Sequence, residues 1–196
     1  MSIQKCTRRP IHAKHKVPSE QEVSKLLSFA HNQPNTNDLR DIVHIVTATG
    51  LRASELCNLL WSDINFRARC IAIKTDNSMA VRQVPFTRKV SRLLRARQKR
   101  QPGSDHVFGL APRRVLDRVS HQLSSFAVQL CARRITLHGL RHAFVTTWVK
   151  AGGSILSLAS ILGYRSSLTK LRDFASPDQR FGIDSCELKR IERRSP

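Results

Sequence analysis

The stretch Thr136-Leu137-His138-Gly139-Leu140-Arg141-His142-Ala143-Phe144 begins an apolar helical pattern and places an imidazole and a guanidinium three residues apart. Residues three apart share a helix face, so His138 and Arg141 can point toward one small anionic group. Leu140 and Phe144 supply the buried side of the same helix. This spacing is typical of a phosphate-binding site, although a His and an Arg on one face are more often an ordinary solvated pair.

A second stretch lies far upstream and pairs another arginine with a carboxylate: Thr49-Gly50-Leu51-Arg52-Ala53-Ser54-Glu55-Leu56. Arg52 and Glu55 can meet across one helical turn, and the carboxylate would then hold the guanidinium in a fixed orientation. The alternative is a surface ion pair of little energetic value.

Together the two stretches resemble the signature boxes of the tyrosine recombinases, the phage-integrase family, in the family's order and within about residues 17–178. The resemblance implies a mainly α fold with a small antiparallel β-hairpin, which is the catalytic domain that breaks and rejoins DNA. It implies that Arg52 and Arg141 contact the scissile phosphate and that His138 assists as hydrogen-bond donor or general base. It also implies that no cofactor, metal or small-molecule substrate takes part. His142 is expected to pack against the protein.

The region of the expected nucleophile departs from the family pattern. The position of the attacking tyrosine falls on Asp173 when counted without a gap from Tyr164, and on Phe174 with a shift of one residue. Phenylalanine has no oxygen, and aspartate would form a labile acyl phosphate in place of a stable phosphotyrosyl bond. The single tyrosine of the chain is Tyr164, where the family normally carries His or Trp. We expect it to donate a hydrogen bond to a phosphate oxygen.

Two short strands are predicted over residues 70–74 and 81–85, around a polar turn at residues 75–78. They resemble the family's hairpin, whose lysine protonates the leaving 5′ oxygen. Lys74 is the candidate for that general acid, although the family's lysine usually lies nearer the tip. The alternative is an exposed lysine at the end of a strand.

Helices are predicted from the capping box at Ser19 and Glu22 to Ala30, from Thr36 to Ala48, and from Arg52 through Leu60. Further helices are predicted after Thr87, over residues 112–132, from the His138 stretch to Gly152-Gly153, and from Ser154 to Gly163. The helix after Thr87 has a very basic outer face, formed by Arg88, Lys89, Arg92, Arg95, Arg97, Lys99 and Arg100. The basic side chains expected to contact DNA are Arg52, Arg141, Arg82, Arg88, Arg92, Arg95 and Arg165.

The charge balance calls for a polyanionic partner. The chain has 196 residues, of which 34 are Lys or Arg and 14 are Asp or Glu, giving a formal charge of +20. We expect a flexible basic arm over residues 1–16, an integrase-like catalytic domain over 17–182 and a basic tail over 183–196. The family's N-terminal core-binding domain is expected to be absent. Five scattered cysteines read as reduced thiols and suggest no metal site.

Three functional hypotheses follow. The first is a site-specific recombinase of mobile-element type that binds duplex DNA, for which the family resemblance implies a homo-tetramer on paired sites. The second is a cleavage-incompetent DNA-binding descendant of such an enzyme, and the third is a basic RNA-binding module, which would need more stacking aromatics than an aromatic content of 6% provides. With no membrane partner expected, the location expected is cytoplasmic and nucleoid-associated, of prokaryotic or phage type.

Overall fold

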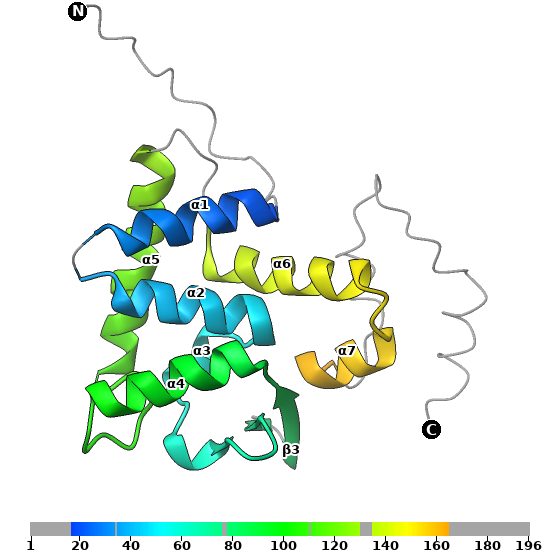
Figure 1. The fold of residues 1–196 in the computed structure, drawn as a ribbon. Coiled ribbons are helices and arrows are strands. Elements are labelled where there is room, and N and C mark those ends of the chain that lie inside the picture. Colours follow the sequence, from blue (N-terminus) through cyan, green and yellow to red (C-terminus); the bar gives the residue numbers. More distant parts are fainter. Residues whose placement is uncertain (1–16, 34, 76–77, 110, 130–134, 165–196) are drawn as a thin grey trace, which may run out of the picture.

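A computed structural model describes residues 17–33, 35–75, 78–109, 111–129 and 135–164 (Figure 1). This part of the chain is mainly helical, with one small antiparallel sheet, so the predicted fold class is confirmed. The predicted arm over residues 1–16 and tail over 183–196 lie outside the described residues. No described helix combines the length and apolar character that a membrane span requires.

The first helix, α1 (Glu20–His31), begins at the predicted capping box. The backbone N–H of Glu22 donates to Ser19 Oγ at 3.2 Å, and the N–H of Ser19 donates to Glu22 Oε2 at 2.8 Å. Both bonds satisfy N–H groups that have no partner inside the helix. Leu26 and Ala30 are buried, and Val23 and Leu27 are partly buried against the core.

The helix α2 (Asn37–Thr49) forms the centre of the core, because most of its side chains are buried. It packs against α1, α4 (Arg88–Arg100), α5 (Pro112–Gln129) and α6 (Leu137–Lys150). Figure 1 shows α2 lying between α1 and α4, with α6 continuing beside it. It ends at Gly50, whose φ of 66° is left-handed.

The helix that follows Arg52 is shorter than predicted. Helix α3 (Ala53–Cys57) ends before Leu59 and Leu60, which were expected to continue it. The carbonyl of Leu59 accepts from the N–H of Val107 at 2.9 Å, and Leu60 forms a β-bridge with His106. A chain segment distant in sequence therefore takes these backbone groups, and a 3₁₀ turn (Trp61–Asp63) follows.

The sheet has three antiparallel strands in the order β1 (Ile64–Asn65), β2 (Cys70–Thr75) and β3 (Ser78–Pro85). The two predicted strands are confirmed as β2 and β3, with Lys74 opposite Val81. The short strand β1 was not predicted, because two residues are too few to show alternation.

The helices that follow Thr87 and Ser154 begin at the predicted caps, and a cap at Thr136 was not predicted. Thr87 accepts from the N–H of Val90 at the start of α4, and Thr136 accepts from that of Gly139 at the start of α6. Ser154 caps α7 (Ile155–Leu162), which ends at Gly163 with a φ of 75°. Helix α5 runs to Gln129, and the predicted end of this helix lies outside the described residues.

Arg97 is the clearest departure from the predicted pattern of charges. It was placed on the outer face of α4, but its side chain is only 2% exposed. Nη1 lies 2.8 Å from Asp38 Oδ1 and 2.9 Å from Asp41 Oδ2, while Nε donates to the Val107 carbonyl at 2.7 Å. The guanidinium also lies 4.4 Å from the centre of the Phe108 ring. Arg97 thus ties α4 to α2, which a helical pattern alone cannot reveal.

Candidate phosphate-binding site

Arg52 is the N-cap residue of α3 and is held by the carboxylate one turn later. Its Nη1 lies 2.8 Å from Glu55 Oε1, and its backbone N–H donates to Glu55 Oε2 at 2.8 Å. The predicted pairing is therefore present. The side chain of Arg52 is 41% exposed. Glu55 therefore fixes the orientation of the guanidinium while leaving it accessible to solvent.

Arg82 on β3 supports the same carboxylate from the other side. Its Nη2 lies 2.7 Å from Glu55 Oε2, and its Nε donates to the Ile161 carbonyl of α7 at 2.8 Å. With a side-chain exposure of 8%, Arg82 lies beneath the surface where we expected a direct DNA contact. It holds Glu55 and joins the sheet to α7.

Two opposing effects act on the Glu55 carboxyl. Burial alone would raise its pKa, but the hydrogen bonds from Arg82 and Arg52 outweigh burial and lower the pKa below the ordinary value of 4.5. Glu55 is therefore an anion at neutral pH. Its single charge is shared by two guanidiniums, so the cluster keeps a net positive charge.

Arg141 on α6 is buried, with 3% exposure. Its Nη1 donates to the Gly50 carbonyl and its Nη2 to the Leu162 carbonyl at 3.1 Å. Burial lowers the pKa of this guanidinium, a hydrogen bond with the Tyr164 side chain opposes that shift, and repulsion from Arg52 adds to it. The two predicted arginines are thus close enough to influence one another.

The close approach of the two sequence stretches depends on Gly50. A Cβ at this position would lie 2.5 Å from Cδ1 of Phe144, which is shorter than any real contact. The positive φ of Gly50 also favours a residue without a side chain. Glycine therefore lets the end of α2 pack directly on α6 and presents its carbonyl to Arg141.

Tyr164 lies where the two arginines meet. The guanidinium carbon of Arg52 is 5.9 Å from the centre of its ring, and that of Arg141 is 5.7 Å away. Its backbone N–H donates to the Ala159 carbonyl at 2.9 Å, which anchors the residue to the end of α7. An aromatic face near two cations gives favourable cation–π contacts.

His138 and His142 face each other on the exposed side of α6. Their Nε2 atoms are 2.7 Å apart, and the rings pack edge to face with centroids 4.3 Å apart. A contact this short requires one nitrogen to donate and the other to accept. His142 thus contacts another side chain of its own helix.

A hollow of about 240 Å³ lies beside Arg52 and is also lined by Glu55, Lys74 and Arg82. The structure therefore brings the hairpin lysine to the same depression as Arg52. Lys74 itself is exposed, since it lies near the end of β2.

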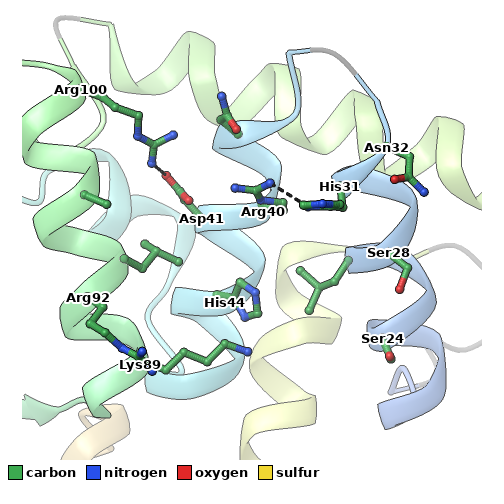
Figure 2. Close-up of a pocket in the computed structure, with 14 residues that line it drawn as sticks. Ser24, Ser28, His31, Asn32, Arg40, Asp41, His44, Lys89, Arg92 and Arg100 are labelled. Atoms are coloured by element: carbon green, nitrogen blue, oxygen red, sulfur yellow. Dashed lines mark hydrogen bonds and ion pairs between the residues drawn. The ribbon is translucent and has the colours of Figure 1, made fainter.

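The other predicted basic residues lie elsewhere or outside the described residues. Arg88, Arg92 and Arg95 are exposed on α4, and Arg95 lies 4.4 Å from the centre of the Phe66 ring. Arg92 lines a separate groove between α1, α2 and α4 (Figure 2). Arg165, Asp173 and Phe174 lie outside the described residues, so the structure does not place the expected nucleophile position.

The supporting role of Arg82 was missed from the sequence, although a signal was present. Positions 82, 84 and 86 alternate with exposed neighbours along the end of the hairpin, and Val84 and Phe86 are plainly apolar. A strand with period two therefore points Arg82 toward the core side. A basic residue at such a position needs a buried acid partner, which Glu55 provides.

Residues 16–176 match the model of the phage integrase family. The chain is 29% identical over 161 residues to tyrosine recombinase XerA from Pyrococcus horikoshii, covering 77% of this chain and 53% of that protein. It is 31% identical over 169 residues to tyrosine recombinase XerD from Chlamydia trachomatis, covering 78% and 55% respectively. The chain therefore spans about half the length of these curated relatives.

A solved structure shares the fold at lower identity. The Tn1549 transposon integrase, in complex with transposon right end DNA, aligns with a TM-score of 0.74 and 20% identity over 94% of this chain and 67% of that chain. At this identity the likeness concerns the fold, which agrees with the helical architecture and small sheet described above.

Proposed function

The chain belongs to the phage integrase family. From that premise we propose that it is a site-specific recombinase catalytic domain that binds a backbone phosphate of duplex DNA. The observation that carries the proposal is the meeting of Arg52 and Arg141 over the Tyr164 ring, at 5.9 and 5.7 Å. Two guanidiniums from distant parts of the chain are held at one place, and one of them is open to solvent.

The proposed chemistry is electrostatic stabilisation of a phosphorus centre. Arginine presents a planar fork to two oxygens and stays protonated, so it can offset charge that builds on a pentacoordinate phosphate. Arg52 is preoriented by Glu55 and Arg141 by two backbone carbonyls, so little reorganisation is needed when an anion arrives. Arg82 acts as a positioning residue through Glu55.

The remaining predicted site residues have subordinate roles in this proposal. Tyr164 donates a hydrogen bond to a phosphate oxygen, His138 acts as donor or general base, and Lys74 protonates a leaving oxygen. The contact between Tyr164 and Arg141 supports the first role, and the shared hollow of Lys74 and Arg52 supports the third.

The proposal is tested by anisotropy measurements with a labelled duplex and with vanadate as a mimic of the transition state. Arg52→Ala and Arg141→Lys should weaken the vanadate-bound state more than Arg88→Ala, which removes an exposed cation of α4. Thermal unfolding of each variant separates a lost contact from a lost fold. Equal effects of all three substitutions would mean that no specific phosphate site exists.

The tyrosine count favours a second candidate, a cleavage-incompetent DNA-binding descendant of a recombinase. The chain has one tyrosine, and it packs against the two arginines that the proposal assigns to the phosphate. The two candidates differ in a denaturing gel after incubation with a pool of nicked duplexes. A covalent adduct supports strand exchange through a 3′-phosphotyrosyl bond, and retained binding without adduct supports the second candidate.

Assembly and cellular location are also proposals. The family resemblance implies a homo-tetramer on paired sites, which analytical ultracentrifugation with duplex DNA would detect. A DNA-joining domain acts where DNA is, so we propose a cytoplasmic, nucleoid-associated location. Family membership favours duplex DNA over the RNA-binding alternative. Tighter binding to single-stranded RNA than to duplex DNA in the same buffer would reverse that preference.

A further inference from the structure

A groove of about 1060 Å³ lies between α1, α2 and α4 (Figure 2). None of the residues that line it lines the hollow beside Arg52, so the two features are separate. Figure 2 shows α2 as the middle element, with α1 and α4 on either side. The proposed phosphate site does not account for this surface.

The rim of the groove is cationic. Its charged residues are Arg40, Lys89, Arg92 and Arg100, with Asp41 as the single carboxylate among the lining residues. Asp41 is already paired with Arg97 at 2.9 Å and with Arg100 at 2.7 Å. Among the described residues, Arg40, Lys89 and Arg92 form no ion pair. Arg40 Nη1 lies 3.3 Å from His31 Nδ1, which brings no negative charge, so the three cations remain without a neutralising carboxylate.

His44 also lines the groove, and its pKa is affected by the positive charge of the rim. Burial lowers the pKa of His44, and the charge of Lys89 lowers it further against the opposing effect of Asp41. Figure 2 shows Lys89 reaching from α4 toward His44 on α2. At neutral pH the imidazole is therefore uncharged, and the positive charge of the rim is carried by the lysine and the arginines.

The floor of the groove is partly apolar. Leu27 on α1 and Leu93 on α4 pack against the core and also line the groove, and Ala96 is exposed beside them. A sugar–phosphate backbone would satisfy the cations but would leave these apolar groups uncovered. An apolar stripe flanked by acidic side chains would satisfy both.

We propose that this groove binds an acidic amphipathic helix of a partner protein. The lining residues of α4 extend from Lys89 to Arg100, a rise of about 16 Å, which a helix of about eleven residues matches in length. Apolar residues of the partner would contact Leu27, Leu93 and Ala96, and its acidic residues would pair with Arg40, Lys89 and Arg92. The tail over residues 183–196 of this chain has four basic and three acidic side chains, a formal charge of +1, so it is not the acidic segment that such a site requires.

The test uses a fluorescein-labelled peptide of about 14 residues with Leu at positions i, i+3, i+4 and i+7 and Glu on its flanks. A second peptide carries Lys in place of Glu. The full chain should bind the acidic peptide and bind the lysine version at least about tenfold more weakly. No binding of the acidic peptide, or equal binding of both, would overturn the proposal.

Matched variants locate the binding. The double variant Lys89→Glu/Arg92→Glu should weaken acidic-peptide binding at least about tenfold. Ala96→Phe, which fills the groove without changing its charge, should do the same. Arg88→Glu/Lys99→Glu makes the same change of charge on the same helix, outside the groove, and should have little effect. An equal loss in this control would mean that the peptide follows net charge, which contradicts a built site. Circular dichroism confirms that each variant folds.

Two further outcomes would assign the groove to another ligand. If Lys89→Glu/Arg92→Glu loses duplex DNA but Arg88→Glu/Lys99→Glu does not, the groove is a DNA surface and the proposal is wrong. If a peptide of residues 183–196 competes as well as the acidic peptide, the occupant is a second copy of this chain. The Arg52→Ala variant should bind the acidic peptide normally, so failure of the phosphate site and failure of the groove are distinguishable.

Discussion

Arg97 and Arg141 are both buried guanidiniums, but they are stabilised in different ways. Arg97 lies within 2.9 Å of two carboxylates, those of Asp38 and Asp41. Arg141 donates to the carbonyls of Gly50 and Leu162, and within the described ranges it forms no ion pair. Carboxylates cancel a charge, whereas carbonyl dipoles hold it in place and leave it positive. Buried charge at Arg97 therefore serves the fold, whereas the charge of Arg141 is not neutralised by a carboxylate among the described residues.

The largest effect is expected from removing the first of these guanidiniums. Arg97→Ala leaves Asp41 buried with Arg100 as its remaining partner, and breaking a buried pair costs about 3–5 kcal/mol. Urea unfolding measures the loss. The control Lys99→Ala removes an exposed cation of the same helix and should change stability by less than about 0.5 kcal/mol. A similar small loss for Arg97→Ala would mean that its ion pairs contribute nothing net.

The second effect concerns the acid that supports Arg52. Glu55→Gln keeps the shape but removes the charge shared by Arg52 and Arg82, at a cost of about 1.5–3 kcal/mol near neutral pH. Unfolding in urea at pH 7 checks the magnitude.

The pH dependence of the same variant gives an independent test. The folded-state pKa of Glu55 lies below its ordinary value of 4.5, so its stabilising effect is complete above that value and is lost as the pH falls through the folded pKa. The stability difference between the original chain and Glu55→Gln should therefore shrink below about pH 4.5. A constant difference down to pH 3 would contradict an ionised, paired Glu55.

The third effect concerns the close packing of Gly50 against Phe144, which positions the Gly50 carbonyl to accept from Arg141. Gly50→Ala imposes a strained φ and a clash with Phe144, and should cost about 1–3 kcal/mol. Gly152→Ala has a φ of 74° but open space around the new Cβ, so it measures the backbone strain alone. Thermal unfolding of the two variants isolates the clash by difference. Equal losses would show that Phe144 moves aside freely.

The smallest effect is a change in salt dependence. Arg52→Ala should reduce the slope of log affinity against log salt concentration for duplex DNA by about 1, because one fewer counterion is displaced. Lys89→Ala, in the groove, should leave the slope unchanged. The slopes come from titrations at several salt concentrations. An equal decrease in both variants would mean that the groove also contacts DNA.

Much of the local structure could be predicted from the sequence. The capping box at Ser19 and the caps at Thr87 and Ser154 depend on hydrogen bonds between residues three apart, so their positions were predicted correctly. The pairing of Arg52 with Glu55 was predicted for the same reason. The early end of α3 was not predicted, because the Leu59 carbonyl accepts from the backbone N–H of Val107, which is distant in sequence.

The placement of the charged side chains was likewise predictable from the sequence only in part. The sequence by itself determined that the chain is strongly basic, where its helices begin, and that it carries two arginine boxes in the order of the phage integrase family. Only the tertiary structure decided that Arg97 is buried against Asp38 and Asp41, and that Arg82 pairs with Glu55 from a distant part of the chain. The physical reason is range: a cap or a helical turn is satisfied within a few residues, whereas burial of a cation requires an acid or a carbonyl brought from a distant part of the chain.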